Sequence, residues 1–117
     1  VNVARVQSEV DRFGPFAPDQ KLAGWSITSL HLVKGALRID VKGTPGQATF
    51  EFSCNSSAQR SPFDLDDAHI FYETRLKYSA VKPVGMALRD QIKAAVSGQD
   101  VCARLRQWRK EARFSNR

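Results

Sequence analysis

Hydrophobic and polar residues alternate along two neighbouring segments of the chain, residues 36–42 and 48–54. Alternation with a period of two is typical of an antiparallel strand that buries one face and exposes the other. Residues 25–33 form a third segment of this kind, and residues 69–78 form a fourth. The pattern therefore predicts a β-meander over residues 25–78.

The turns between these segments predict how the strands pair. A Lys-Gly pair suits a two-residue hairpin loop that places Leu30 opposite Ile39. A Gly-Thr-Pro-Gly sequence suits a four-residue loop that places Ile39 opposite Phe50. A slip by one residue would bury Arg38 and Glu51, which this register leaves as neighbours on the polar face. The predicted buried set is Leu30, Leu37, Ile39, Phe50 and Phe52.

The segment at 25–33 contains a break in the alternation. Trp25 and Ile27 have the opposite parity to Leu30, so a regular strand would point them to the polar face. A β-bulge near Ser29 would turn all three apolar side chains to one face. We expect either this bulge or a tryptophan on the other face of the sheet.

Apolar residues recur with a helical period near both ends of the chain. Near the N-terminus this period predicts a helix over residues 3–13. Over residues 84–114 it predicts two helices, the first opened by Pro83 and closed by a Ser-Gly pair. Asp100 is placed to cap the last helix, and we expect Trp108 to be buried. The apolar stripe of that helix is Val101, Leu105, Trp108 and Ala112.

These elements together predict one domain of the α+β class over residues 1–117. Its expected architecture is an antiparallel four-stranded β-meander packed against an N-terminal helix and two C-terminal helices. A length of 117 residues is enough for one core. No apolar run approaches the roughly 18 residues of a transmembrane helix, so we expect no membrane-spanning segment.

The positive charge of the chain is concentrated near its C-terminus. The net charge is +6, and residues 101–117 hold six basic residues and one acidic residue, whereas the rest holds 12 and 11. A basic helix can be a solvated surface or a docking site for a polyanion, and arginine suits carboxylate and phosphate groups. The candidate binding residues are Arg104, Arg106, Arg109, Lys110 and Arg113.

Cys54 and Cys102 are the two cysteines of the chain. Cys54 has the parity of the buried sheet face, and Cys102 adjoins the apolar stripe of the last helix. Packing of that helix on the sheet would bring them together, so they are a candidate disulfide, with two separate buried thiols as the alternative. A bridge would favour an exported or periplasmic protein, and free thiols would favour a cytoplasmic one.

Acidic residues and a histidine gather before the fourth strand, at Asp64, Asp66, Asp67 and His69. They could bind a divalent cation, but they lack the spacing of an EF-hand and the further ligands of a zinc site. We therefore expect a solvated loop whose aspartates cap turns, and no metal site. Asn55 begins a glycosylation sequon, a short pattern that is frequent by chance.

The sequence contains no catalytic or phosphate-binding motif and therefore favours a domain without enzymatic activity. We expect a binding or adaptor domain that docks an acidic partner through the basic helix and needs no cofactor. The partner could be an acidic protein surface or another polyanion, such as nucleic acid or an anionic membrane surface. The alternatives are a small enzyme or ligand-binding domain that uses the concave side of the sheet, and a nucleic-acid-binding module.

Overall fold

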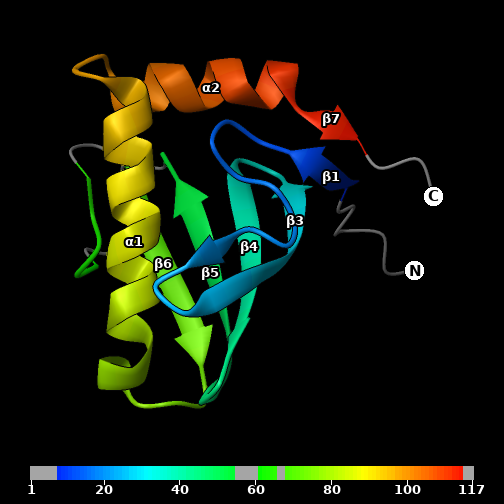
Figure 1. The fold of residues 1–117 in the computed structure, drawn as a ribbon. Coiled ribbons are helices and arrows are strands. Elements are labelled where there is room, and N and C mark those ends of the chain that lie inside the picture. The colour runs from blue at the N-terminus through cyan, green and yellow to red at the C-terminus, as the bar shows by residue number, and fades with distance from the viewer. Residues whose placement is uncertain (1–7, 55–60, 66–67, 115–117) are drawn as a thin grey trace, which may run out of the picture.

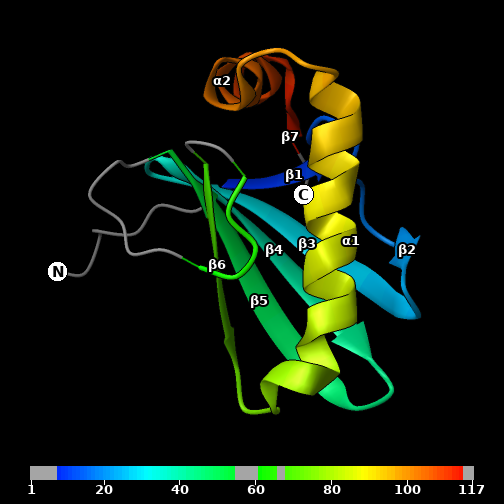
Figure 2. The ribbon, with the colours of Figure 1, turned by 90° about the vertical axis from the view of Figure 1, so that its left-hand side faces the viewer.

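The computed structural model describes residues 8–54, 61–65 and 68–114, and it confirms the α+β class. A long helix lies against one face of an antiparallel sheet, and a second helix lies crosswise at the end of the sheet (Figures 1 and 2). The strands are β1 (Ser8–Arg12), β2 (Lys21–Leu22), β3 (Trp25–Val33), β4 (Ala36–Gly43), β5 (Gly46–Ser53), β6 (His69–Thr74) and β7 (Arg113–Phe114), and the helices are α1 (Tyr78–Val96) and α2 (Val101–Glu111).

Strands β3 to β6 form the predicted meander in the predicted register. Ile39 pairs with Leu30 in β3 and with Phe50 in β5, and all three side chains are fully buried. Arg38 pairs with Glu51 on the opposite face, where Glu51 is exposed and Arg38 is partly exposed. The strands therefore bury the apolar half of their alternating pattern and leave the charged half outside.

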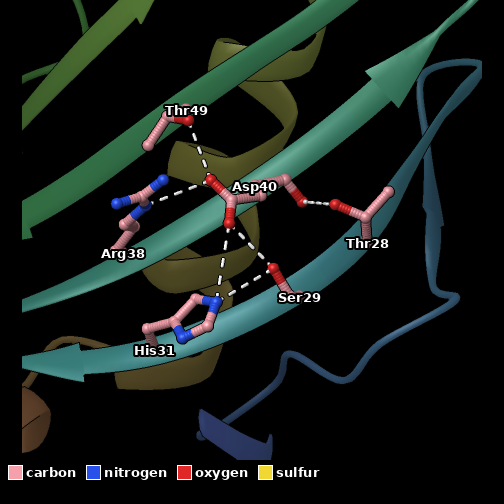
Figure 3. Close-up of polar contacts among 6 residues, drawn as sticks. All are labelled: Thr28, Ser29, His31, Arg38, Asp40 and Thr49. Atoms are coloured by element: carbon pink, nitrogen blue, oxygen red, sulfur yellow. Dashed lines mark hydrogen bonds and ion pairs between the residues drawn. The ribbon is translucent and has the colours of Figure 1, made fainter. Parts of the chain in front are cut away.

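The irregularity predicted in β3 is a β-bulge. The register with β4 shifts between Ile27 and Ser29, which leaves Thr28 as the extra residue. Trp25 and Ile27 consequently face the core and are only 4% and 1% exposed. The bulge also leaves Thr28 and Ser29 together on the polar face, beside Asp40 of β4 (Figure 3).

The prediction of an N-terminal helix over residues 3–13 is wrong for the part that the structure describes. Residues 8–12 are strand β1, in which Val10 pairs with Leu30 of β3. The edge of β3 carries backbone N–H and C=O groups that need partners, and a strand supplies them where a helix would not. Val10 is buried in either structure, so its spacing from Phe13 could not distinguish strand from helix.

Three short strands extend the predicted four-stranded meander to a sheet of seven strands. The order along the sheet is β6-β5-β4-β3-β1-β7, and β2 pairs with the remaining length of β3. Strand β7 contains Arg113 and Phe114, so the last helix ends at Glu111 and does not reach Phe114 as predicted. These additions use short segments in which two or five residues are too few to show an alternation.

Helix α1 begins at Tyr78, not near residue 84, and therefore contains Pro83 in its second turn. The predicted fourth strand ends correspondingly early, at Thr74. Proline in a helix removes one backbone hydrogen bond and disfavours this start. Burial of an apolar face along the whole helix offsets that cost, and the buried residues are Val81, Val84, Gly85, Leu88, Ile92 and Val96. Ser97 and Gly98 close the helix with left-handed backbone, as predicted.

Phe63 joins the helix to the sheet, although it lies in an irregular segment that the sequence pattern leaves outside the core. Its side chain is fully buried and meets the rings of Phe50 and Tyr72 edge-on. On its other side it lies against the backbone of α1 at Gly85, where a Cβ atom would be 2.4 Å from the ring. Glycine is therefore required at this position for the helix to approach so closely.

Replacing the buried Phe63 by alanine should destabilise the fold far more than replacing a phenylalanine that lies outside the core. Phe63→Ala leaves a cavity between sheet and helix and should lower the free energy of unfolding by about 3–5 kcal/mol. Phe114→Ala is the matched control, because Phe114 is 54% exposed and its loss should cost less than about 0.5 kcal/mol. Urea denaturation measures both, and similar losses for the two variants would contradict the role of Phe63.

Candidate functional site

Helix α2 carries most of the predicted binding residues. A disulfide and a buried tryptophan are two of the contacts that fix its place in the fold. Asp100 caps the helix, as predicted, by accepting a hydrogen bond from the backbone N–H of Cys102 at 3.1 Å. The candidate disulfide is present between Cys102 and Cys54, just after β5, with their Cα atoms 5.9 Å apart. Trp108 is 5% exposed, as predicted, and its ring lies against the backbone of Gly14.

Arg109 supplies a third contact between the helix and the sheet. Its Nη1 and Nη2 donate hydrogen bonds to the carbonyl oxygens of Ala36 and Val33, at 3.1 and 2.8 Å. These two carbonyls flank the turn between β3 and β4, so the guanidinium ties α2 to that hairpin. Both acceptors are neutral carbonyl oxygens, so these bonds attach the helix without pairing Arg109 with an acidic group.

The other predicted binding residues differ in their surroundings. Arg104 lies over the Trp108 ring, with Cζ 5.6 Å from the ring centroid, and donates to Gln107 at 2.9 Å. Arg106 and Lys110 are exposed, and no hydrogen bond or ion pair joins either of them to another described residue. Arg113 is exposed on β7 and pairs there with Arg12 of β1, so it lies beyond the helix.

A small apolar pocket opens beside these cations, between α2 and the hairpin of β3 and β4. Its volume is about 110 Å³. Arg106 and Arg109 line it together with Gly35, and its apolar lining consists of Phe13, Ala36, Leu37, Phe52, Cys54 and Leu105. The lining contains two cations and no acidic residue, so the site is suited to an apolar group attached to an anion. We call it the α2 pocket.

A second polar cluster lies on the outer face of the sheet, around Asp40 (Figure 3). Asp40 Oδ1 accepts hydrogen bonds from Thr49 at 2.8 Å and Arg38 Nε at 3.2 Å, and Oδ2 accepts one from Ser29 at 2.8 Å. Burial by itself raises the pKa of Asp40. The three hydrogen bonds and the charge of Arg38 outweigh burial and lower this pKa below the usual value for an aspartate. Asp40 is therefore a carboxylate held in its charged form.

His31 completes this cluster, which thereby contains a serine, a histidine and an aspartate. His31 Nε2 lies 3.1 Å from Ser29 Oγ and 3.6 Å from Asp40 Oδ2. In a catalytic triad the serine and the carboxylate contact different ring nitrogens, so that the base takes the serine proton. Here both lie at the same nitrogen and Ser29 donates to Asp40 (Figure 3), so the geometry does not activate the hydroxyl. The network instead ties the bulge in β3 to β4 and, through Asp40, to Thr49 of β5.

The acidic segment before β6 holds a contact between a histidine and an aspartate. Asp64 Oδ2 lies 3.0 Å from His69 Nδ1, while Asp66 and Asp67 lie outside the described residues, as does Asn55 of the sequon. Within the ranges 8–54, 61–65 and 68–114, no three His, Cys, Asp or Glu side chains are grouped to hold a metal ion. The described part of this segment therefore shows a histidine–aspartate contact and no metal-ligand set.

No family model, curated protein or solved structure matches the chain. None of the helices that the structure describes is long and apolar enough to cross a membrane. The features of the chain that bear on function are therefore the side chains of the α2 pocket and of the outer cluster. The sequence pattern identifies the cations of α2 but not the pocket, whose walls come from four separate parts of the chain.

Removing the charge of Asp40 should make the free energy of unfolding change less with pH in the acid range. A carboxyl group whose pKa is lowered by folding stabilises the fold above its unfolded pKa, and this contribution is lost as pH falls through the folded-state pKa. Asp40→Asn should thus cost about 1–3 kcal/mol at neutral pH, and its stability should approach that of the natural chain in strong acid.

Urea denaturation between about pH 2 and pH 7 measures this convergence. Glu51→Gln is the matched control, because Glu51 is exposed on the same sheet face and forms no hydrogen bond or ion pair with a described residue. If the difference in unfolding free energy between the natural chain and Asp40→Asn stays constant over this range, the lowered pKa of Asp40 is contradicted.

Removing the disulfide should weaken the attachment of α2. The bridge joins residues 48 positions apart, and the chain-entropy model gives about 4 kcal/mol for closing a loop of this length. The double variant Cys54→Ser, Cys102→Ser should lose stability of this order, and thermal unfolding with and without reductant measures it. The natural chain in reductant should resemble the variant, and an unchanged melting temperature in both would contradict this role.

Proposed function

We propose that this domain has no enzymatic activity and docks an acidic protein partner through a basic surface on α2. We call it the α2 surface, and its residues are Arg104, Arg106, Arg109 and Lys110. The observation that carries the proposal is that none of these four cations has an acidic side chain within ion-pair distance among the described residues. The single acid of α2, Glu111, instead accepts a hydrogen bond from Gln107.

The attachment of α2 supports this proposal, because it presents the cations on a fixed helix. Leu105 and Trp108 are buried, and the disulfide and Arg109 hold the helix at two further points. A partner that binds a preformed surface has less conformational entropy to remove than one that must order a flexible tail. A fixed set of cations also attracts an acidic partner over a distance of about 8–10 Å at physiological salt.

An acidic protein is better supported than a nucleic acid. Non-specific binding of single strands uses aromatic rings on which bases stack. Trp108 is the aromatic residue of α2, and it is 5% exposed. The α2 pocket offers an apolar cavity, which an aliphatic side chain can fill and a phosphate backbone cannot. The pocket therefore favours a partner with amino-acid side chains.

The alternative of a small enzyme or ligand site on the concave side of the sheet receives less support. Helix α1 covers one face of the sheet (Figure 2). The side chains of Val81, Val84 and Leu88 on this helix are fully buried. The large apolar residues of β3, β4 and β5 are buried against them. That face is therefore part of the core in this structure.

We place the docking in an oxidising compartment, because disulfides persist in exported and periplasmic proteins and are rare in the cytoplasm. The Cys54–Cys102 bridge supports this location. It also links location to function, because the bridge holds the helix that carries the proposed surface.

Neutralising two exposed cations of α2 should strongly weaken binding to an acidic probe and leave the fold intact. The variant is Arg106→Gln, Lys110→Gln, and the probe is fluorescent poly-glutamate, followed by anisotropy. Binding by the natural chain should weaken steeply as salt is raised from about 10 mM to about 1 M. The variant should bind at least about tenfold more weakly, with a change in unfolding free energy below about 0.5 kcal/mol.

The matched control is Lys82→Gln, Lys93→Gln, which removes the same charge from exposed positions of α1. Equal losses in both double variants would show that net charge, not the α2 surface, causes binding, and would refute the proposal. Tighter binding to a DNA duplex than to poly-glutamate, again lost in the α2 variant, would replace it with the nucleic-acid alternative.

A further inference from the structure

We infer that the α2 pocket binds the C-terminal residue of the partner chain, with an aliphatic side chain in the pocket and the terminal carboxylate on Arg106. The inference rests on the proposed function and specifies which part of an acidic protein partner is recognised. It combines three features of the pocket: its size, its paired cations and its fixed walls.

The size of the pocket selects an aliphatic side chain. An apolar cavity of about 150 Å³ holds a benzene ring. The α2 pocket is open on one side and has about 110 Å³, so it suits a side chain between valine and leucine in size better than the larger indole ring of tryptophan. Its floor is apolar, because Leu37, Phe52 and Leu105 line it and are each no more than 8% exposed. Burial of such a side chain there would contribute binding free energy in proportion to the apolar area covered.

The charges at the pocket select a carboxylate beside that side chain. Arg106 is exposed and has no partner among the described residues, so its planar guanidinium is free to bind both oxygens of a carboxylate. Arg109 also lines the pocket, and its bonds to two neutral carbonyl oxygens hold its charge in place. An anion at the mouth would therefore meet two cations and displace neither from an acidic partner.

The closeness of Arg106 to the pocket favours a chain end over an internal acidic residue. At a C-terminus the side chain and the carboxylate branch from the same Cα atom. In an extended internal segment, neighbouring side chains point to opposite sides, so an acid that follows the aliphatic residue would point away. The next residue on the same side lies about 7 Å further along the chain. A terminal residue thus places both groups at the pocket together.

The walls of the pocket are preformed. Cys54, which follows β5, lines the pocket and is bonded to Cys102 of α2, and the Arg109 hydrogen bonds join α2 to the hairpin that completes the pocket. A ligand therefore need not pull the elements together, and little ordering opposes its binding.

Short peptides that differ only at their last residue test this inference on the intact chain. The probe is a peptide without charged side chains that ends in Gly-Ser-Gly-Leu with a free carboxylate. Its binding is measured from chemical-shift changes of the backbone amides. Amidation of the carboxylate should weaken binding about tenfold or more, as should a terminal alanine. A terminal tryptophan should bind no better than alanine. Equal binding of the free acid and the amide would overturn the inference.

Two variants connect the preferences to the pocket. Arg106→Gln should remove the preference for the acid over the amide, whereas Lys82→Gln on α1 should preserve it. Ala36→Leu should fill the pocket and remove the preference for leucine over alanine, and the end-group comparison on the natural chain remains decisive if this variant does not fold. A preference that survives Arg106→Gln would place the carboxylate site elsewhere and overturn the assignment.

The outcomes separate this inference from the proposed function. Salt-dependent binding of poly-glutamate through α2 without any end-group preference would overturn the C-terminal site and keep the docking surface. A leucine-carboxylate preference that depends on Arg106, without poly-glutamate binding, would support the pocket and refute the wider basic surface.

Discussion

Three different contacts hold helix α2 across the end of the sheet, and the proposed site depends on all of them. The Cys54–Cys102 bridge fixes the first turn of the helix, Trp108 packs near its end, and Arg109 reaches the hairpin of β3 and β4. A helix of 11 residues is marginal in isolation, so these contacts, more than helix propensity, keep it folded. They also create the α2 pocket, which exists only where helix and hairpin face each other.

Close packing of aromatic rings on glycine backbones recurs through the core and explains how its layers meet. At three glycines a Cβ atom would lie within 2.4 to 2.6 Å of a buried ring, so a larger residue would push the layers apart. One of these contacts joins α1 to the sheet, one joins α2 to the segment after β1, and one joins the end of β4 to the start of β3. The pairs are Gly85 with Phe63, Gly14 with Trp108, and Gly43 with Trp25.

The sequence predicts those features whose signal is local and repeated. Strands β3, β4 and β5 each have eight or nine residues, long enough for the alternation to determine their register. The parity of Trp25 left two alternatives, of which the structure shows the bulge. The error at residues 3–13 has the opposite cause, because strand β1 is determined by the free edge of β3. Phe63 and the early start of α1 likewise depend on tertiary packing, which no period in the chain records.

The candidate site shows the same division between local and tertiary signals. Composition identifies a cluster of cations near the C-terminus but treats Arg106 and Arg109 as equivalent. The structure separates them, since Arg109 bonds to Val33 and Ala36 while Arg106 has no partner among the residues described. The first is needed to build the pocket and the second is free to bind at its mouth. Their three-residue spacing is close to one helical turn, so both lie on the same side of α2, beside the pocket. One turn of helix thus supplies both the support and the recognition group.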